Sequence, residues 1–298
     1  MGAQRSPDTF PPLYFRVRQT HRVWQEAIFS WPQLHCLFNI YNYSLAMVSA
    51  PLYNHACKLP LVLIVFACSL CLAQSPSDFE VRTDKLVYQS TMDTDASVKD
   101  WVMEGPGQVK FADGWLEMHS PNEEMHHVYW CPEKLPSNFI AQWEMQNLHL
   151  EAGLCIVFFA ATGLGGEDVM DSSLPKRDGT FSQYNNGDLK NYHISYYAHN
   201  PKLPARPVAR LRRNPGKNIV YEGPPGIHSE SDRVHKVTLI KNEAHIKLFV
   251  DERPIIDWID NGDINGPPLG VGRIALRQMQ WTQFRYRNFK VWSIKSNS

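Results

Sequence analysis

The sequence predicts an all-β protein, a sandwich of two antiparallel sheets preceded by an N-terminal targeting segment. From residue 108 onward, short runs rich in Val, Ile, Phe, Tyr and Trp alternate with Gly, Pro, Asn and Asp, which is typical of sandwiches. No stretch there has the period of an amphipathic helix of useful length. Upstream, residues 59–73 form an apolar run without charge.

That apolar run has the order of a signal peptide. Lys58 precedes it, the small residues of 71–73 offer a cleavage site, and polar residues follow. A run of about 15 residues is short for a membrane-spanning helix, which needs about 20. We therefore expect a signal peptide at 47–73, with a membrane anchor as the alternative, and export to the periplasm or the extracellular space. Residues 1–46 lack periodicity and indicate a disordered extension or a start codon placed too far upstream.

The remaining chain, 74–298, is predicted to be the sandwich domain. Residues 235–241 and 245–250 alternate with period two around a turn at Asn242–Glu243, which predicts a hairpin. Residues 153–161 are apolar on both faces and predict a central, covered strand. The full set of predicted strands is 108–112, 115–119, 127–130, 139–146, 153–161, 192–197, 209–213, 235–241, 245–250, 255–259, 272–278 and 284–294.

One polar connection, residues 162–190, breaks this rhythm. Connections of this length are uncommon in compact domains, and its aromatic residues and paired charges favour an ordered, site-forming loop. Four of its acidic residues are candidates for a structural calcium ion, although their spacing does not match a helix-loop-helix site; they are Asp168, Asp171, Asp178 and Asp188. We expect no cofactor and no metal, with this calcium as the alternative.

The net charge limits the classes of binding partner, and the cysteine content limits the possible disulfides. The formal net charge is zero, so nothing indicates nucleic acid, and a membrane would be contacted only through an uncleaved N-terminal segment. Cys131 and Cys155 are the two cysteines of the predicted domain. A disulfide between them is allowed in an oxidising compartment, and buried free thiols are the alternative.

Four segments carry a resemblance to a known family. Residues 100–111 (DWVMEGPGQVKF), 126–136 (HHVYWCPEKLP), the long stretch 153–197 and 272–279 (GRIALRQM) resemble the YesU-like family, bacterial proteins of unknown function with a concanavalin A-like lectin/glucanase fold. The resemblance covers about residues 86–294. It implies a jelly roll of two antiparallel sheets, one lining a concave groove, and an acidic plant or algal oligosaccharide or polysaccharide as partner. The fold alone fixes no chemistry.

Glycoside hydrolysis is the less favoured chemistry. It requires two carboxyl groups about 5 to 9 Å apart, yet residues 139–146 supply only Glu144. Elimination at a uronate requires a base, a group that binds the carboxylate, and an acid such as Tyr. On one strand, His193, Ser195 and Tyr197 are expected to share a face. Arg277 has the planar geometry that matches a carboxylate.

We therefore predict a secreted, carbohydrate-active lyase or dehydratase with His193, Tyr197 and Arg277 as catalytic residues. The alternatives are a non-catalytic, lectin-like carbohydrate-binding module and a glycoside hydrolase using Glu144. Histidine and tyrosine in strands are more often structural than catalytic. Residues predicted to bind substrate are His127, Trp130, Glu144, Tyr184, Arg212 and Gln278.

Overall fold

The computed structural model describes residues 14–16, 80–121, 126–199 and 208–295. Apart from the three-residue β1 (Tyr14–Arg16), the predicted extension and signal peptide therefore lie outside the described residues. The predicted domain boundary at residue 74 also lies outside them and stays a prediction. Within the part of the chain that the structure describes, no helix has the length and hydropathy needed to cross a membrane.

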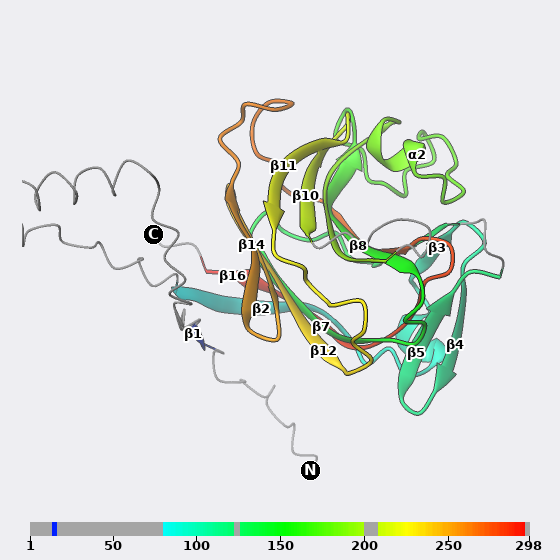
Figure 1. Ribbon diagram of the computed structural model, residues 1–298. Helices are drawn as coiled ribbons and strands as arrows, with labels where there is room; N and C mark the ends of the chain where they lie inside the picture. Colours follow the sequence, from blue (N-terminus) through cyan, green and yellow to red (C-terminus); the bar gives the residue numbers. More distant parts are fainter. Residues whose placement is uncertain (1–13, 17–79, 122–125, 200–207, 296–298) are drawn as a thin grey trace, which may run out of the picture. The chain divides into compact units, whose positions relative to one another are not determined.

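The described residues form two sheets, and every strand pair with a resolved register is antiparallel (Figure 1). The first sheet has nine strands in the order β1-β2-β16-β7-β12-β13-β14, with β5 on β16 and β4 on β5. Its strands after β1 are β2 (Glu80–Ser90), β4 (Gln108–Ala112), β5 (Trp115–His119), β7 (Phe139–Asn147), β12 (His235–Asn242), β13 (His245–Val250), β14 (Arg253–Ile259) and β16 (Gln283–Ile294).

The second sheet has seven strands in the order β11-β10-β9-β8-β15-β6-β3. Two short helices, η1 (Asp95–Val98) and α2 (Ser182–Asn185), lie in connections. The strands are β3 (Val102–Glu104), β6 (His127–Trp130), β8 (Gly153–Gly163), β9 (Leu189–His199), β10 (Ala209–Asn214), β11 (Asn218–Gly223) and β15 (Arg273–Gln278). The predicted sandwich of two antiparallel sheets is confirmed.

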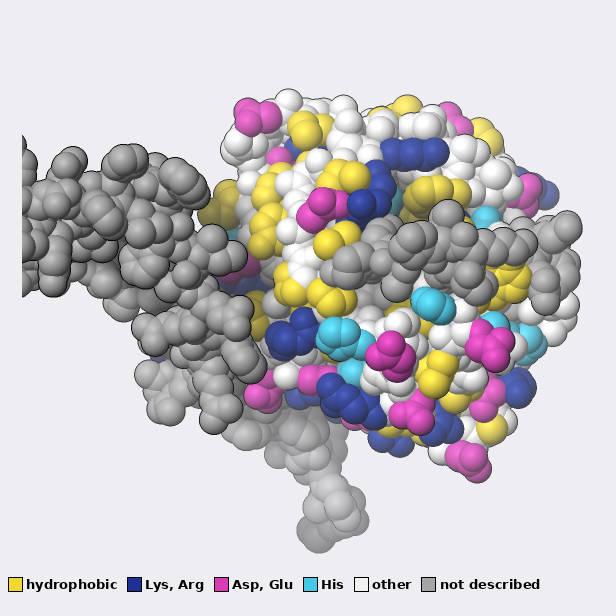
Figure 2. All heavy atoms as spheres, viewed as in Figure 1, with side chains coloured by type: hydrophobic (Ala, Val, Ile, Leu, Met, Phe, Trp, Pro, Cys, Tyr) yellow, Lys and Arg dark blue, Asp and Glu magenta, His cyan; other side chains and the backbone are white. Residues whose placement is uncertain are grey.

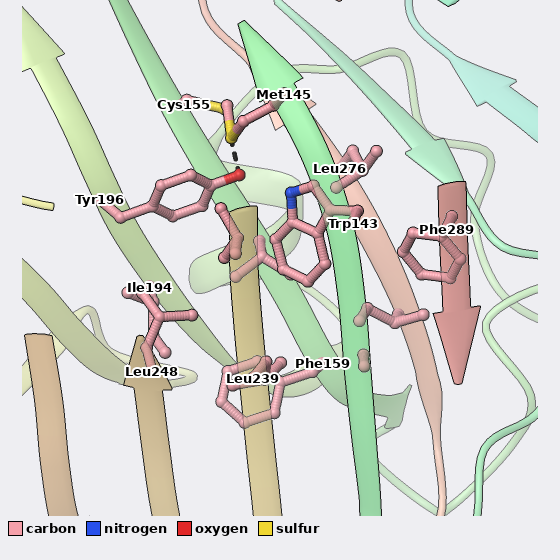
Figure 3. Close-up of a cluster of buried hydrophobic side chains, with 14 of the residues drawn as sticks. Trp143, Met145, Cys155, Phe159, Ile194, Tyr196, Leu239, Leu248, Leu276 and Phe289 are labelled. Atoms are coloured by element: carbon pink, nitrogen blue, oxygen red, sulfur yellow. Dashed lines mark hydrogen bonds between the residues drawn. The ribbon is translucent and has the colours of Figure 1, made fainter. Parts of the chain in front are cut away.

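The main core lies between the two sheets. It contains the inward side chains of β7, β8, β9 and β16, such as Trp143, Phe159, Ile194 and Phe289, which gather in Figure 3. In the same figure the Tyr196 hydroxyl points at Cys155, 3.4 Å from its sulfur. Cys131 and Cys155 are both free and buried, so the free-thiol alternative is the correct one.

A second, smaller apolar cluster covers the outer face of the seven-stranded sheet, the face turned away from the main core. Phe158 and Trp130 from the sheet pack there against Tyr184 from the loop that joins β8 to β9. Strand β8 is thus buried on both faces at the middle of its sheet, as its apolar sequence predicts. The loop of residues 164–188 is ordered and forms a layer over this face.

The predicted strands all occur, with small shifts at their ends, and the predicted hairpin is β12–β13. Three strands of the domain were not predicted: β2, β3 and β11. Strand β2 carries four charged residues among eleven and is largely exposed along its outer side, so its hydrophobic signal is weak. Strands β3 and β11 lie at the two edges of their sheet, where short and polar segments are tolerated.

Strand β9 contains a bulge that the sequence pattern did not reveal. Cys155 pairs with Tyr197 and the next residue, Ile156, pairs with Ser195, so Tyr196 is an extra residue in β9. An extra residue restarts the in–out alternation of the strand. Side chains on either side of Tyr196 are therefore not related by the simple period of two.

Candidate functional site

Two rows of side chains cross the outer face of the seven-stranded sheet, because directly paired residues of neighbouring strands point to the same side. The first row is Arg212, His193, Phe158, Ala275 and Trp130, on strands β10, β9, β8, β15 and β6. The second row is Arg210, Ser195, Ile156, Arg277, Val128 and Glu104, which extends the series to β3. Polar and cationic groups are thus set into an otherwise apolar surface.

The ring of Phe181, just before α2, lies over these rows. The guanidinium carbon of Arg277 is 4.5 Å from its centroid, and the His193 ring packs against it edge-on at 5.7 Å. The ammonium group of Lys217, in the turn between β10 and β11, is 5.6 Å from the same centroid. A half-buried aromatic ring is therefore flanked by two cations and an imidazole.

Glu104 anchors the loop to the edge of the sheet. Arg177 donates two hydrogen bonds to its carboxylate, of 2.7 and 3.2 Å. The indole N–H of Trp130 and the hydroxyl of Tyr184 donate to the same carboxylate, at 2.9 and 2.8 Å. A second ion pair, between Arg273 and Asp168, holds the start of the loop at 2.6 Å. Trp130 and Tyr184, which we predicted to bind substrate, are thus already committed to holding Glu104.

Arg277 has a different environment. Its side chain is 0% exposed, and Nε, Nη1 and Nη2 all lack a hydrogen-bond partner among the described residues. Burial lowers the pKa of Arg277 to about 10, so the group is still charged at neutral pH. Figure 2 shows acidic and basic side chains interspersed over the face that it displays.

His193 is 1% exposed and lies in the row beside Arg212. The Nδ2 atom of Asn214 is 2.8 Å from both His193 Nδ1 and Asn191 Oδ1. With that amide nitrogen as the donor, Nδ1 of His193 is the acceptor, and the proton of the neutral imidazole sits on Nε2.

Tyr197 does not join His193 and Arg277, and the prediction that it shares a face with His193 is wrong. The bulge at Tyr196 turns Tyr197 inward, level with Cys155. There Tyr197 packs edge-on against Phe284 at 5.1 Å within the main core. The predicted trio is therefore split between two faces of one sheet.

Three further predicted residues lie away from the outer face. His127 and Gln278 are directly paired and point into the sandwich, where Gln278 contacts the Tyr286 hydroxyl at 3.0 Å and His127 contacts the Ser120 hydroxyl at 3.0 Å. Glu144 belongs to the other sheet. It lies on the outer side of β7, bound by Arg287 at 2.6 Å. A site that contains Glu144 together with His193 is excluded, because the sandwich separates them.

The predicted residues that the structure brings to the outer face are His193, Arg277, Arg212, Trp130 and Tyr184. Arg212 is half-buried there and donates to the carbonyl of Lys217 at 2.5 Å. Sequence reasoning missed Glu104, Asn214 and the central place of Phe181. Glu104 is followed by Gly-Pro-Gly, which gave only a turn signal, and its partner Arg177 lies 73 residues away.

The loop aspartates do not converge. Asp168 binds Arg273 and the amide of Met170, while Asp171 and Asp178 accept from backbone amides two residues on, in local turns. Across the described residues, no group of three or more His, Cys, Asp and Glu side chains is arranged to hold a metal ion. The expected alternative of a loop calcium therefore gains no support from the geometry.

Two other features resemble functional sites, a hydrogen-bonded Ser–His–Asp chain and a groove. Ser231, His235 and Asp251 form a hydrogen-bonded chain, with both links 2.7 Å long. Asp251 also binds Arg233 and the amide of Lys236, so the chain fastens the connection before β12 to the β13–β14 turn. A groove of about 530 Å³ beside η1 is lined by residues such as Tyr88 and Lys290. Its serines already bond to its own backbone, which indicates a structural role.

Comparison with known proteins places the chain in a family. Residues 85–291 match the model of a domain of unknown function, DUF1961. The chain belongs to the DUF1961 family. A curated relative, the uncharacterised protein YesU of Bacillus subtilis (strain 168), is 36% identical over 208 residues, which are 69% of this chain and 94% of YesU.

Solved structures agree on the fold of this DUF1961 protein. A Bacillus subtilis protein of unknown function, described as having a galectin-like fold, is 34% identical with a TM-score of 0.69, and the match covers 72% of this chain and 98% of that one. The exoplasmic/lumenal domain of VIP36, in a Ca²⁺/Man3GlcNAc-bound form, is 10% identical with a TM-score of 0.51, over 72% and 92% of the two chains. The latter likeness concerns the fold alone. The predicted family and its lectin-like fold are confirmed.

Proposed function

We propose that this DUF1961 protein binds an oligosaccharide on the outer face of its seven-stranded sheet, and that residues 164–188 form one wall of the site. The observation that carries the proposal is the Phe181 ring, flanked by Arg277, Lys217 and His193. A sugar has an apolar C–H face that stacks on an aromatic ring, and hydroxyl groups that bind flanking N–H donors. Both kinds of group meet here.

The fold is compatible with this proposal. The VIP36 domain, which shares the fold, is described as bound to Man3GlcNAc. A shared fold does not choose a ligand, and the side chains of the outer face are what favour a saccharide. The proposal has two finer parts. The saccharide is acidic, and residues 47–73 direct the protein out of the cytoplasm.

Binding accounts for these side chains better than elimination does. An elimination requires a base near the acidic C–H of the sugar, and the Nδ1 atom of His193 is already engaged by the amide of Asn214 at 2.8 Å. The acid expected from the sequence, Tyr197, lies in the core. The outer face therefore offers donors and a stacking ring, which are the requirements of a binding site.

The test is calorimetric titration of the purified protein with neutral and uronate-containing oligosaccharides from plant and algal polysaccharides. We expect binding to at least one of them, weakened about tenfold or more by Phe181→Ala, because central aromatic residues carry much of the binding energy. Phe111→Ala removes a half-buried phenylalanine on β4 of the other sheet and should leave the affinity unchanged.

Two outcomes would contradict the proposal. Either no saccharide binds, or the two phenylalanine variants weaken binding equally. Ultraviolet absorbance of each mixture is followed over time, since a steady rise from an unsaturated product would show that the protein is an eliminating enzyme and not a binding module.

A further inference from the structure

The inference concerns Arg277, and it rests on the proposed function. We infer that Arg277 is the receptor for a carboxylate of the bound saccharide, so that the ligand class is a uronate-containing oligosaccharide. The first step is an imbalance in the structure. A charged guanidinium is fully buried, yet none of its three nitrogens has a hydrogen-bond partner among the described residues. Buried charges in proteins are normally paired, because leaving water without compensation is costly.

A second arginine of the same protein shows what a structural role looks like. Arg213 is equally buried, at 0% exposed. Its Nη1 donates to both carboxylate oxygens of Asp260 at 2.7 and 2.8 Å, and its Nη2 donates to the carbonyls of Asn265 and Pro267. Among the described residues, the fold therefore supplies partners to both terminal nitrogens of Arg213 and leaves only its Nε without one. Arg277 lacks such partners, which indicates that its partner comes from outside the chain.

Among the described residues, the carboxylate in the row of Arg277 already has its own partners. Glu104 lies in the same row as Arg277, but its two oxygens receive hydrogen bonds from Arg177, Tyr184 and Trp130. The stacked ring of Phe181 compensates only part of the charge, since a cation–π contact is weaker than a pair of charged hydrogen bonds. The positive groups Lys217 and Arg212 lie nearby on the same face and add to the attraction for an anion.

The geometry favours a planar anion. Phe181 covers one face of the guanidinium and the side chain is 0% exposed, so an anion that displaced the surrounding side chains would meet Arg277 at the edge of its plane. A carboxylate is planar and meets the guanidinium edge with two parallel hydrogen bonds. In a saccharide, the carboxylate is that of a uronic acid, held while the sugar ring contacts Phe181.

The experiment uses the uronate oligosaccharide that binds best in the titration above, and its carboxyl-reduced counterpart of the same length and linkage. We expect the wild-type protein to bind the uronate form, and Arg277→Met to weaken that binding at least about thirtyfold. Arg277→Lys should recover part of the affinity, because it restores charge without the bidentate geometry. Arg285→Met, on β16 of the other sheet, controls for loss of a positive charge and should bind like the wild type.

A second measurement does not depend on the sugar. Replacing an unpaired buried charge with an apolar side chain of similar length should raise the melting temperature of the free protein, by at least about 2 °C for Arg277→Met. Lower stability of this variant, together with a folded circular dichroism spectrum, would show that the guanidinium is satisfied within the chain and would overturn the inference.

The outcomes separate the inference from the proposed function. If the uronate and carboxyl-reduced forms bind equally well, sugar binding stands and the role of Arg277 fails. If a sulfated neutral saccharide binds in an Arg277-dependent way and no uronate does, the carboxylate assignment is wrong. If no saccharide binds at all, the proposed function itself fails.

Discussion

The extra residue in β9 decides what Tyr197 is able to do. Reading the strand with a strict period of two places Tyr197 beside His193 on one face. The bulge at Tyr196 reverses this and buries Tyr197 against Phe284. A tyrosine whose ring fills the core has a packing role, and its hydroxyl is remote from any ligand on the outer face.

Tyr197→Phe should therefore leave saccharide binding within about twofold of the wild-type value, because only a hydroxyl on the core side is removed. Calorimetric titration measures this, with Phe181→Ala as the variant expected to weaken binding. A tenfold loss in Tyr197→Phe would place its hydroxyl at the ligand after all.

Residue patterns along a strand predict only in part which face of the sheet each side chain occupies. His193 and Arg277 were predicted as members of one site, and the structure places both on the outer face of the seven-stranded sheet. Gln278 and His127 were misplaced because no pattern shows which face of a strand turns inward when both of its neighbours are apolar. Arg277 precedes Gln278 by one residue, and that single step separates the outer face from the core.

The loop of residues 164–188 is held by contacts with distant elements and not by its own secondary structure. Its one helix, α2, has four residues. Arg177 and Tyr184 from the loop both bind Glu104 at the end of β3. The sequence predicted an ordered loop from its aromatic and charged residues, but the anchor joins segments 73 residues apart and was beyond local patterns.

Glu104→Ala should lower the free energy of unfolding by about 3 kcal/mol, because it leaves the nearly buried Arg177 guanidinium and the Trp130 and Tyr184 donors without their acceptor. Urea denaturation measures the change. Limited proteolysis should then cut first within residues 164–188.

The matched control is Glu222→Ala, which breaks the exposed pair with Arg210 and should cost less than about 1 kcal/mol. Equal losses in the two variants would show that Glu104 is not a specific anchor.

Two adjacent histidines make the free energy of unfolding of the whole domain depend on pH. Burial, reinforced by the charge of Arg277, lowers the pKa of His126 to about 4 and that of His127 to about 3. In the unfolded chain both titrate near 6.5. Between about pH 6.5 and these lower values the unfolded state binds more protons, so stability is greatest above pH 6.5 and falls as the pH decreases.

His127→Gln should therefore flatten the loss of stability between pH 6.5 and 4.5. A histidine that is protonated in the unfolded state and neutral in the folded state changes the free energy of unfolding by up to about 1.4 kcal/mol per pH unit. Urea midpoints measured across the range test this, with the exposed His228→Gln as a control that keeps the wild-type slope. Parallel curves for His127→Gln and the wild type would contradict the assignment.

The architecture was more predictable than the site because alternation and turn residues recur along the whole chain, whereas the site depends on which sheet each strand joins. Glu144 illustrates the difference. Its strand, β7, was predicted with nearly correct bounds, yet nothing local shows that β7 joins the nine-stranded sheet while β9 joins the other.

Strand β16 has a consequence for how the protein is made. It is the last described strand in the chain, yet it lies inside its sheet and pairs with β2, β5 and β7. While the ribosome is still synthesising residues 283–294, these three earlier strands lack the neighbour that joins them. The nine-stranded sheet is therefore completed only after translation has passed residue 294. Shortened chains that end before β16 are left with unpaired strand edges, which promote aggregation.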